Sequence, residues 1–313
     1  MNNIQHRRDF LKTIAASAAG SLVAASVAGS LTAHAAAPTR RLKIGFTCIT
    51  WGTFPRLTPD VTLEAALKDI ANLGFWGFET FGETLIDWDS RQALQALIDR
   101  YGVPLKSGYC GTNLTDSTKC ADSIAKVIEM GKAIKKYGGT FGVLAPNGVH
   151  RDSYDFKMYR DGIVSGLNDH AKALNDLGLG AGLHQHTGTC IETRDEVYAV
   201  MDAVDTKHVK FAPDVGQLQK GGADAAKVIK DYLPLVEHMH LKDFVGGKPW
   251  GGYCPLGMGK VDIPTILDML EAGGNKLDVM IEQDPSADQP ISPTQSAEIS
   301  KVYLQKLGYT FRS

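Results

Sequence analysis

Eight short apolar runs, rich in β-branched and aromatic residues, alternate with longer segments of helical periodicity from Arg41 onward. The runs are Leu42–Ile49, Gly77–Phe81, Leu105–Cys110, Thr140–Ala145, Ala181–His186, Val209–Val215, Glu237–Leu241 and Leu277–Gln283. Strands that alternate with helices form parallel sheets, and eight such units close into a barrel. The pattern therefore predicts an α/β fold, a single-domain (β/α)₈ TIM barrel.

The segments between the runs repeat their apolar residues at the spacing of amphipathic helices. One of them shows the pattern i, i+3, i+4 and i+7 with Ile263, Ile266, Leu267 and Leu270. An open, doubly wound sheet is the alternative fold. No Gly-x-Gly-x-x-Gly motif follows the first run, which argues against a dinucleotide-binding version of that sheet. No linker-like stretch interrupts residues 36–313, which we expect to form one domain.

Residues 1–35 have the features of an export signal. Arg7 and Arg8 stand directly before Asp-Phe-Leu-Lys, a mildly apolar run follows, and residues 33–35 (Ala-His-Ala) match a signal-peptidase pattern. The segment is similar to a bacterial twin-arginine signal, so we expect a periplasmic mature protein that begins near Ala36. An uncleaved membrane anchor is the alternative. The rest of the chain contains no second long apolar stretch, so we expect no membrane span in the mature protein.

Charge and cysteine content narrow the classes of partner. The formal net charge is −2 and no basic stripe occurs, which argues against nucleic acid and anionic membranes. The five cysteines are widely spaced and include no Cys-x-x-Cys pair, so a cysteine-based metal site is not expected. An oxidising destination would permit one disulfide, whose partners the sequence does not identify. Assembly into a homo-oligomer stays open.

Imidazoles and carboxylates follow each of the last four predicted strands. The fifth strand ends with His184 and His186, the sixth reaches Asp214, the seventh carries His240 and the eighth reaches Glu282. Function in such barrels lies at the C-terminal ends of the strands. Each residue alone has an ordinary structural explanation, such as a helix cap or a buried ion pair. Together they predict a shared divalent ion, with Mn²⁺, Co²⁺, Fe²⁺, Zn²⁺ and Mg²⁺ all open.

Several motifs around these residues carry a family resemblance. They are His184–Thr189, Glu192–Glu196, Pro213–Gly216, His238–Asp243, Pro255–Gly259 and Glu282–Pro285, with Ile44–Gly52 and Gly74–Glu79 nearer the front. These motifs resemble those of the xylose isomerase-like barrel superfamily of sugar isomerases and epimerases, and within it those of inosose dehydratases. The resemblance covers nearly all of residues 36–313.

The resemblance implies a metal site with ligands on strands five to eight. Asp214, His240 and Glu282 match the family's ligands by position and type. The family's strand-five glutamate is absent, so His184 in its place is the expected fourth ligand, with His186 as the alternative.

The resemblance also implies chemistry at the carbon next to a carbonyl. Removal of its proton requires an oxyanion to be stabilised by fixed charge and a base to lie within reach. We expect Glu282 to be both ligand and possible base, and His186 to donate or accept a proton. We expect Lys242 to neutralise the enediolate or bind substrate, and Glu79 to be a second acid or base, or else a partner for a Lys or Arg at the barrel mouth. Residues expected to bind substrate are Trp51, Gln217 and Trp250.

Several reactions can follow that proton transfer. Reprotonation gives epimerisation or isomerisation, whereas loss of a β-substituent makes a dehydratase or lyase, which the inosose dehydratase likeness favours. Export favours an unphosphorylated keto-sugar or keto-cyclitol, and the glycine-rich stretch Phe244–Gly259 is a candidate lid or an ordinary long loop. A catalytically inactive sugar-binding barrel is the main alternative, because the family's strand-five glutamate is missing and Gln217 replaces its histidine. Endonuclease IV-like DNA repair shares the barrel but needs a basic DNA track.

Overall fold

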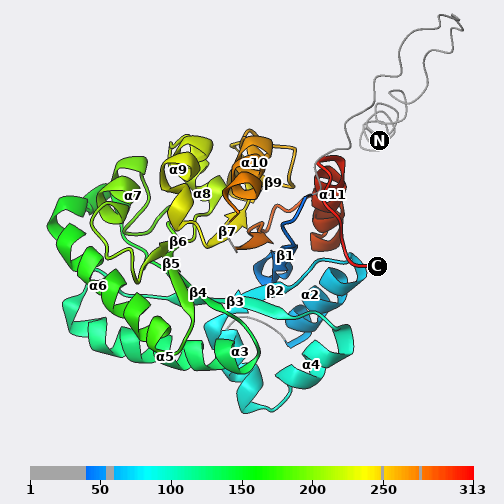
Figure 1. The fold of residues 1–313 in the computed structure, drawn as a ribbon, viewed down its shortest axis with the longest axis horizontal. Coiled ribbons are helices and arrows are strands. Elements are labelled where there is room, and N and C mark those ends of the chain that lie inside the picture. Colours follow the sequence, from blue (N-terminus) through cyan, green and yellow to red (C-terminus); the bar gives the residue numbers. More distant parts are fainter. Residues whose placement is uncertain (1–39, 54–59, 248–249, 275–276) are drawn as a thin grey trace, which may run out of the picture. The chain divides into compact units, whose positions relative to one another are not determined.

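Eight parallel strands form one large sheet in the order β6-β5-β4-β3-β2-β1-β10-β7. Their bounds are β1 (Ile44–Thr47), β2 (Phe78–Phe81), β3 (Leu105–Gly111), β4 (Phe141–Ala145), β5 (Gly180–Leu183), β6 (Lys210–Phe211), β7 (His238–Leu241) and β10 (Asp278–Ile281). Parallel bridges join Phe211 to Val236 and Asp214 to His240, so the two outer strands meet. The strands form a ring with the helices outside it (Figure 1). The predicted (β/α)₈ barrel is therefore confirmed, and the open-sheet alternative is wrong.

The computed structural model describes residues 40–53, 60–247, 250–274 and 277–313. The barrel lies in a compact unit that spans Pro38–Ser313. The predicted twin-arginine signal at residues 1–35 lies outside the described residues. Among the described residues, no helix has both the length and the apolar character needed to cross a membrane.

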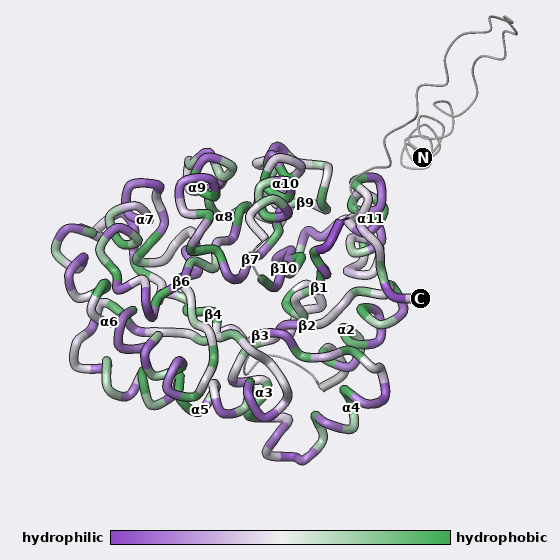
Figure 2. The backbone as a smooth tube through the Cα atoms, viewed as in Figure 1, coloured by the Kyte–Doolittle hydropathy of each residue, from purple (hydrophilic) through white to green (hydrophobic). Residues whose placement is uncertain are grey.

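The helices that follow the strands begin at residues whose side chains satisfy free backbone N–H groups. Thr193 and Glu196 form a reciprocal capping box at the start of α7, and Ser292 and Gln295 form another at the start of α11. The helices are α2 (Asp60–Asn72), α3 (Gly82–Ser90), α4 (Leu94–Tyr101), α5 (Cys120–Lys136), α6 (Phe156–Asp176), α7 (Arg194–Met201), α8 (Val215–Lys220), α9 (Ala225–Tyr232), α10 (Ile263–Gly273) and α11 (Pro293–Lys306). Hydrophobic and hydrophilic residues alternate along them, as expected for helices with one face against a barrel (Figure 2).

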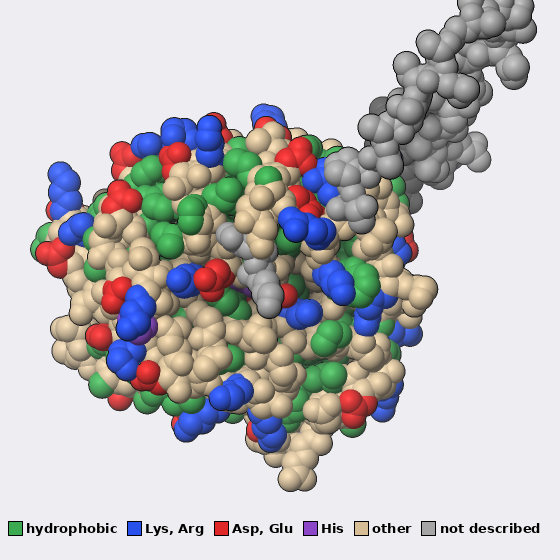
Figure 3. Space-filling view, viewed as in Figure 1, with side chains coloured by type: hydrophobic (Ala, Val, Ile, Leu, Met, Phe, Trp, Pro, Cys, Tyr) green, Lys and Arg blue, Asp and Glu red, His purple; other side chains and the backbone are tan. Residues whose placement is uncertain are grey.

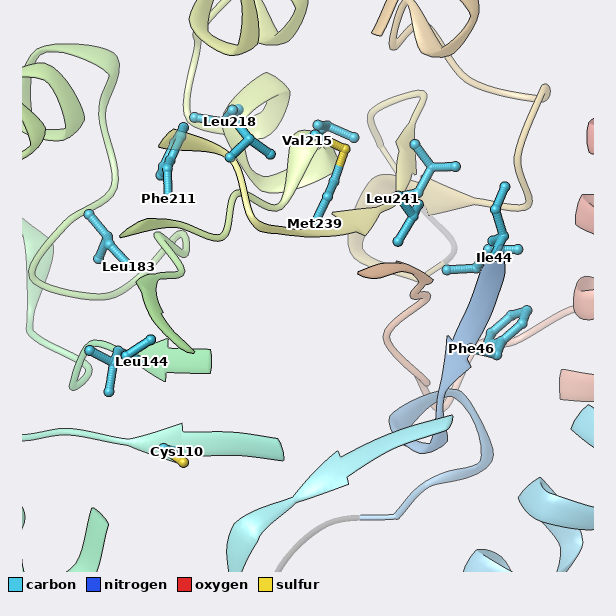
Figure 4. Close-up of a cluster of buried hydrophobic side chains, with 14 of the residues drawn as sticks. Ile44, Phe46, Cys110, Leu144, Leu183, Phe211, Val215, Leu218, Met239 and Leu241 are labelled. Carbon is cyan, nitrogen blue, oxygen red and sulfur yellow. The ribbon is translucent and has the colours of Figure 1, made fainter. Parts of the chain in front are cut away.

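The alternation of side chains along the strands separates an outer core from a polar barrel interior. In β7, Met239 and Leu241 join the large hydrophobic core, part of which Figure 4 shows. His238 and His240 point the other way because successive strand residues face opposite sides. A smaller apolar cluster of Phe141, Val143 and Ala212 is separate from the large core. Phe141 stacks on His238, which places this cluster inside the barrel beside the histidines.

Three strands that lead to the candidate site end earlier than predicted. β5 ends at Leu183, β6 at Phe211 and β10 at Ile281, whereas we expected them to reach His186, Val215 and Gln283. In β6, Pro213 has no N–H to donate to a neighbouring strand, and Asp214 is already the N-cap of α8. The polar residues therefore lie in the first turns beyond the strands.

The described residues contain no disulfide. All five cysteines are free thiols, and only Cys120 is not fully buried. Burial raises the pKa of the Cys190 thiol to about 12 and that of Cys254 to about 12, so both are protonated at neutral pH. These cysteines behave as small apolar residues of the core rather than as nucleophiles.

Candidate metal centre and active-site cavity

Three buried side chains converge at the C-terminal ends of strands β5, β6 and β7. His184, Asp214 and His240 each offer a ligand atom, and these atoms all lie within 4.8 Å of one another. The three residues are completely buried. Neither ring nitrogen of His184 has a hydrogen-bond partner. Asp214 Oδ2 lies 2.9 Å from the ammonium of Lys242, and His240 Nδ1 lies 3.1 Å from Glu282 Oε2. Because buried polar atoms are nearly always satisfied, the unpartnered imidazole of His184 beside Asp214 and His240 makes this group a candidate cation site.

Glu282, the fourth expected ligand, lies beside this group rather than within it. Its Oε2 is 3.1 Å from His240 Nδ1, and its Oε1 accepts a hydrogen bond from Lys242 Nζ at 2.7 Å. Glu282 follows β10 directly and is only 4% exposed. Glu282 therefore contacts the group through His240.

Lys242 occupies the centre of the carboxylates. Its ammonium lies 2.9 Å from Asp214 Oδ2, 2.7 Å from Glu282 Oε1 and 3.1 Å from Asp284 Oδ2. Burial alone would lower the pKa of Lys242, but Asp214, Asp284 and Glu282 together raise that pKa well above its ordinary value. The structure thus places Lys242 among the carboxylates with no exposed surface of its own.

Glu79 bridges two histidines across the barrel interior. Its Oε1 accepts a hydrogen bond from His240 Nε2 at 2.6 Å, and its Oε2 lies 2.9 Å from His238 Nε2. Ser107 Oγ also donates to Oε2. Burial would raise the pKa of Glu79, but His240 and His238 lower it well below the ordinary range. The partners of Glu79 are therefore imidazoles, not the rim Lys or Arg that we considered.

The pKa of His240 is raised, whereas that of Glu79 is lowered. Burial alone would lower the pKa of His240, but the carboxylates of Glu282 and Glu79 raise that pKa to about 9. The pKa of His184 is held well below its ordinary value, first by burial and then by the nearby His240 and His186. Neutral imidazole is the form that binds metal, so His184 is ready to bind, and His240 has to lose a proton first.

A hydrogen-bonded chain links His186, Gln217 and Asp284. His186 Nδ1 donates to the carbonyl of Thr187 at 2.7 Å, which leaves its Nε2 to accept from Gln217 Nε2 at 2.7 Å. Gln217 Nε2 also lies 3.5 Å from Asp284 Oδ2, and Gln217 Oε1 accepts from Thr187 Oγ1 at 2.7 Å. Gln217 is fully buried, so the structure places it behind His186 rather than on an open surface.

A cavity of about 350 Å³ opens beside these groups. Its lining combines acidic and basic side chains with apolar and hydroxylated ones. Its lining residues are Thr47, Ile49, Glu79, Thr80, Phe81, Tyr109, His186, Glu282 and Asp284. Pockets of this size and mixed character bind small molecules.

The structure does not bring every predicted residue to this cavity. Trp51 packs against Phe46, and its indole N–H donates to Asp69 Oδ2 at 2.9 Å, away from the lining residues. The side chain of Trp250 lies outside the described residues. The stretch Phe244–Gly259 includes a short antiparallel hairpin of β8 (Asp243–Phe244) and β9 (Tyr253–Cys254).

A second cavity, of about 530 Å³, lies at the opposite end of the barrel. Lys106, Glu237 and Asp278 line it, at or just before the starts of their strands. Charged side chains of both signs face it, without a convergent set of histidines among the residues that line it. On the face drawn in Figure 3, Lys and Arg likewise lie among Asp and Glu rather than in one patch.

Three residues near the site received no role from the sequence. Asp284 is two residues beyond Glu282 and lines the cavity beside it, a spacing that could have indicated it. His238 is two residues before His240 and shares its face of β7 by the same rule. Tyr109 stacks on His240 with ring centroids 6.2 Å apart, a contact between distant strands that no local spacing predicts.

An eight-stranded parallel barrel with clustered imidazoles and carboxylates beyond its strand ends defines a TIM barrel with a candidate metal-binding active site. The model of the xylose isomerase-like TIM barrel family matches residues 67–303. The chain belongs to this family.

Individual relatives agree with that assignment. The chain is 24% identical over 296 residues to an inosose dehydratase of Geobacillus kaustophilus, with 85% of this chain and 94% of the relative covered. A 3-keto-D-glucoside 4-epimerase from E. coli superposes with a TM-score of 0.64 at 19% identity, covering 85% of this chain and 99% of the other. A xylose isomerase-like barrel from Mycobacterium smegmatis in complex with magnesium gives 0.67 at 18% identity, covering 85% and 97%.

Proposed function

We propose that this protein is a metal-dependent enzyme that removes a proton from the carbon next to the carbonyl of a keto-sugar or keto-cyclitol. Elimination of a β-hydroxyl, or reprotonation with inversion, completes the reaction. The observation that carries the proposal is the convergence of His184, Asp214 and His240 beside a small-molecule cavity. The dehydratase and epimerase names of the relatives support the same reaction class.

The buried donor set fits a divalent ion. His184, Asp214 and His240 would hold it, with Glu282 as the fourth ligand, and their nitrogen and oxygen atoms suit Mn²⁺, Co²⁺, Zn²⁺ or Mg²⁺ in differing degree. A bound ion would act as a Lewis acid toward the substrate's carbonyl oxygen.

Two groups at the cavity are placed for proton transfer. Glu282 lines the cavity and is the proposed base that takes the proton from the α-carbon. His186 is the proposed group that returns a proton to carbon or to the leaving hydroxyl. Its Nε2 is bonded to Gln217, so His186 acts by exchanging this partner for the substrate.

Asp284 and Lys242 have supporting parts in this scheme. Burial would raise the pKa of Asp284, but Lys242 and His186 lower it, so Asp284 is ionised and can accept a hydrogen bond from a substrate hydroxyl. Lys242 does not line the cavity, and we assign it to holding the three carboxylates in place.

The proposed substrate is unphosphorylated and the proposed location is the periplasm. The described residues that line the cavity include no Lys or Arg, the side chains that most often bind phosphate. The twin-arginine pattern at Arg7 and Arg8 supports export of the folded, metal-loaded enzyme.

Metal analysis and an isotope experiment test this function. Purified protein should hold about one divalent ion per chain, and Asp214→Ala should lose both the ion and the activity while it keeps its circular dichroism spectrum. Keto-inositols, 3-keto-glycosides and free ketoses should be incubated in D₂O, with NMR to follow deuterium entry beside the carbonyl and any new double bond.

The outcomes separate the candidate functions. Exchange with a new double bond identifies a dehydratase or lyase, and exchange without one identifies an epimerase or isomerase. Sugar binding with no exchange on any of these compounds would identify the non-catalytic binding barrel instead. Full activity in protein stripped of metal would refute the proposed mechanism.

A further inference from the structure

A buried carboxylate connects the candidate metal ligand His240 to a second histidine. Glu79 comes from β2, whereas His238 and His240 come from β7, and the two strands are not neighbours in the sheet. Both oxygens of Glu79 are engaged, Oε1 with His240 Nε2 at 2.6 Å and Oε2 with His238 Nε2 at 2.9 Å. The contact therefore crosses the inside of the barrel and ties its two sides together.

This contact determines which nitrogen of His240 is available. A carboxylate only accepts hydrogen bonds, so the shared proton belongs to His240 Nε2. The proton that His240 loses when it binds a metal is therefore the one on Nδ1, which lies 3.1 Å from Glu282 Oε2. Because Nε2 is held by Glu79, Nδ1 is the ring nitrogen left to His240 in the group formed with His184 and Asp214.

His238, the second histidine bound to Glu79, is also held in place. His238 is fully buried and stacks on Phe141, with ring centroids 5.2 Å apart and an interplanar angle of 13°. Ser107 on β3 donates to Glu79 Oε2 as a further partner. Neither His238 nor Ser107 lines the cavity, so neither touches a molecule bound there.

We propose that Glu79 and His238 are positioning residues, which fix the ring of His240 so that its Nδ1 binds the metal. The inference rests on the proposed metal centre. It changes the role of Glu79 from the acid or base expected from the sequence to an acceptor that acts through His240. Partners of this kind, behind a ligating histidine, raise its basicity and fix its orientation, and their loss weakens metal binding about 10–100-fold.

Two replacements of Glu79 distinguish the effect of its charge from the effect of its hydrogen bonds. A glutamine at the position could accept from His240 through its oxygen and donate to His238 through its amide nitrogen, and would lack only the charge. A leucine would fill similar space and offer neither bond. The two replacements therefore separate the electrostatic contribution from the orientation.

The test is a titration of metal-free protein with Co²⁺, followed by its visible d–d absorption, which reports both affinity and ligand geometry without any substrate. Glu79→Gln should weaken Co²⁺ binding about tenfold, and Glu79→Leu should weaken it towards 100-fold with an altered band shape. His238→Leu should fall between the wild type and Glu79→Leu. Glu196→Gln is the matched control, because Glu196 is another buried carboxylate, paired with Arg151 at 2.7 Å outside the site.

Each outcome decides the matter. Normal Co²⁺ affinity and spectrum in both Glu79→Gln and Glu79→Leu would overturn the inference while leaving the metal centre intact. Two Co²⁺ ions in the wild type and one in Glu79→Gln would show that Glu79, His238 and His240 form a second metal site, and would also overturn it. A wild-type protein that binds no metal would overturn the metal centre and this inference together.

Discussion

Replacement of Lys242 by methionine should destabilise the metal-free protein strongly. The ammonium is completely buried and has three carboxylate partners within 3.1 Å, whose side chains are 0%, 5% and 25% exposed. Methionine keeps most of the side-chain volume but leaves Asp214, Glu282 and Asp284 without their shared cation. Breaking a buried ion pair from one side costs about 3–5 kcal/mol. For a domain of this size, that loss lowers Tm by roughly 6–20 °C.

The assay is chemical and thermal unfolding of wild type and Lys242→Met, with EDTA and with saturating Mn²⁺ or Co²⁺. A divalent ion that binds only the folded state adds about 2.7 kcal/mol at 100 times its Kd, and should partly restore the variant because it replaces the lost positive charge. Lys172→Met is the control, since its pair with Asp176 is mostly exposed, and such pairs contribute about 0–1 kcal/mol. A Lys242→Met protein as stable as this control in EDTA would refute the reasoning.

Three further predictions concern other parts of the chain. Burial lowers the pKa of His170, so below pH about 6.5 the unfolded chain binds a proton that the folded protein does not. The free energy of unfolding measured in urea should therefore decrease as the pH drops below about 6.5, and it should decrease less in His170→Gln. Thr193→Ala removes a capping box and should cost about 1 kcal/mol in the same measurement, with unchanged metal binding. Replacement of both Arg7 and Arg8 by lysine should keep the precursor in the cytoplasm, which cell fractionation would detect. N-terminal sequencing of the exported wild-type protein should give a start near Ala36.

The fold was predictable because its signals are local. A short apolar run indicates each strand, and helical periodicity together with caps such as Thr193 and Ser292 indicates the helices. The strand ends were less predictable: apolar residues such as Val215 continue past β6 because the start of α8 is also buried. Hydrophobic pattern alone does not distinguish a buried strand from the buried turn that follows it.

The candidate site was likewise predictable only in the part that depends on local sequence signals. His184, Asp214 and His240 could be placed together because consecutive strands of a barrel end at one rim. The partners of Glu79 could not be predicted, because its contacts join β2 to β7 across the interior and depend on the diameter of the barrel. The partners of Lys242 follow neighbouring strands, but its burial among them could not be predicted from the sequence. From the sequence, a lysine one residue beyond a strand is expected at the surface, whereas the structure buries Lys242 completely.

Charge balance inside the barrel supports the proposed cation site. The carboxylates of Glu79, Asp214, Glu282 and Asp284 are opposed by the ammonium of Lys242 and, below pH about 9, by the imidazolium of His240. That arrangement leaves about two negative charges in a region of low dielectric constant, where uncompensated charge is costly. Lys242 cannot remove this excess negative charge, because it carries a single positive charge and already contacts three of the four carboxylates. A divalent ion among His184, Asp214 and His240 would bring two positive charges while His240 gives up its proton, so the excess would fall to about one negative charge. The electrostatics of the cluster and the geometry of the three residues therefore support the same proposed occupant.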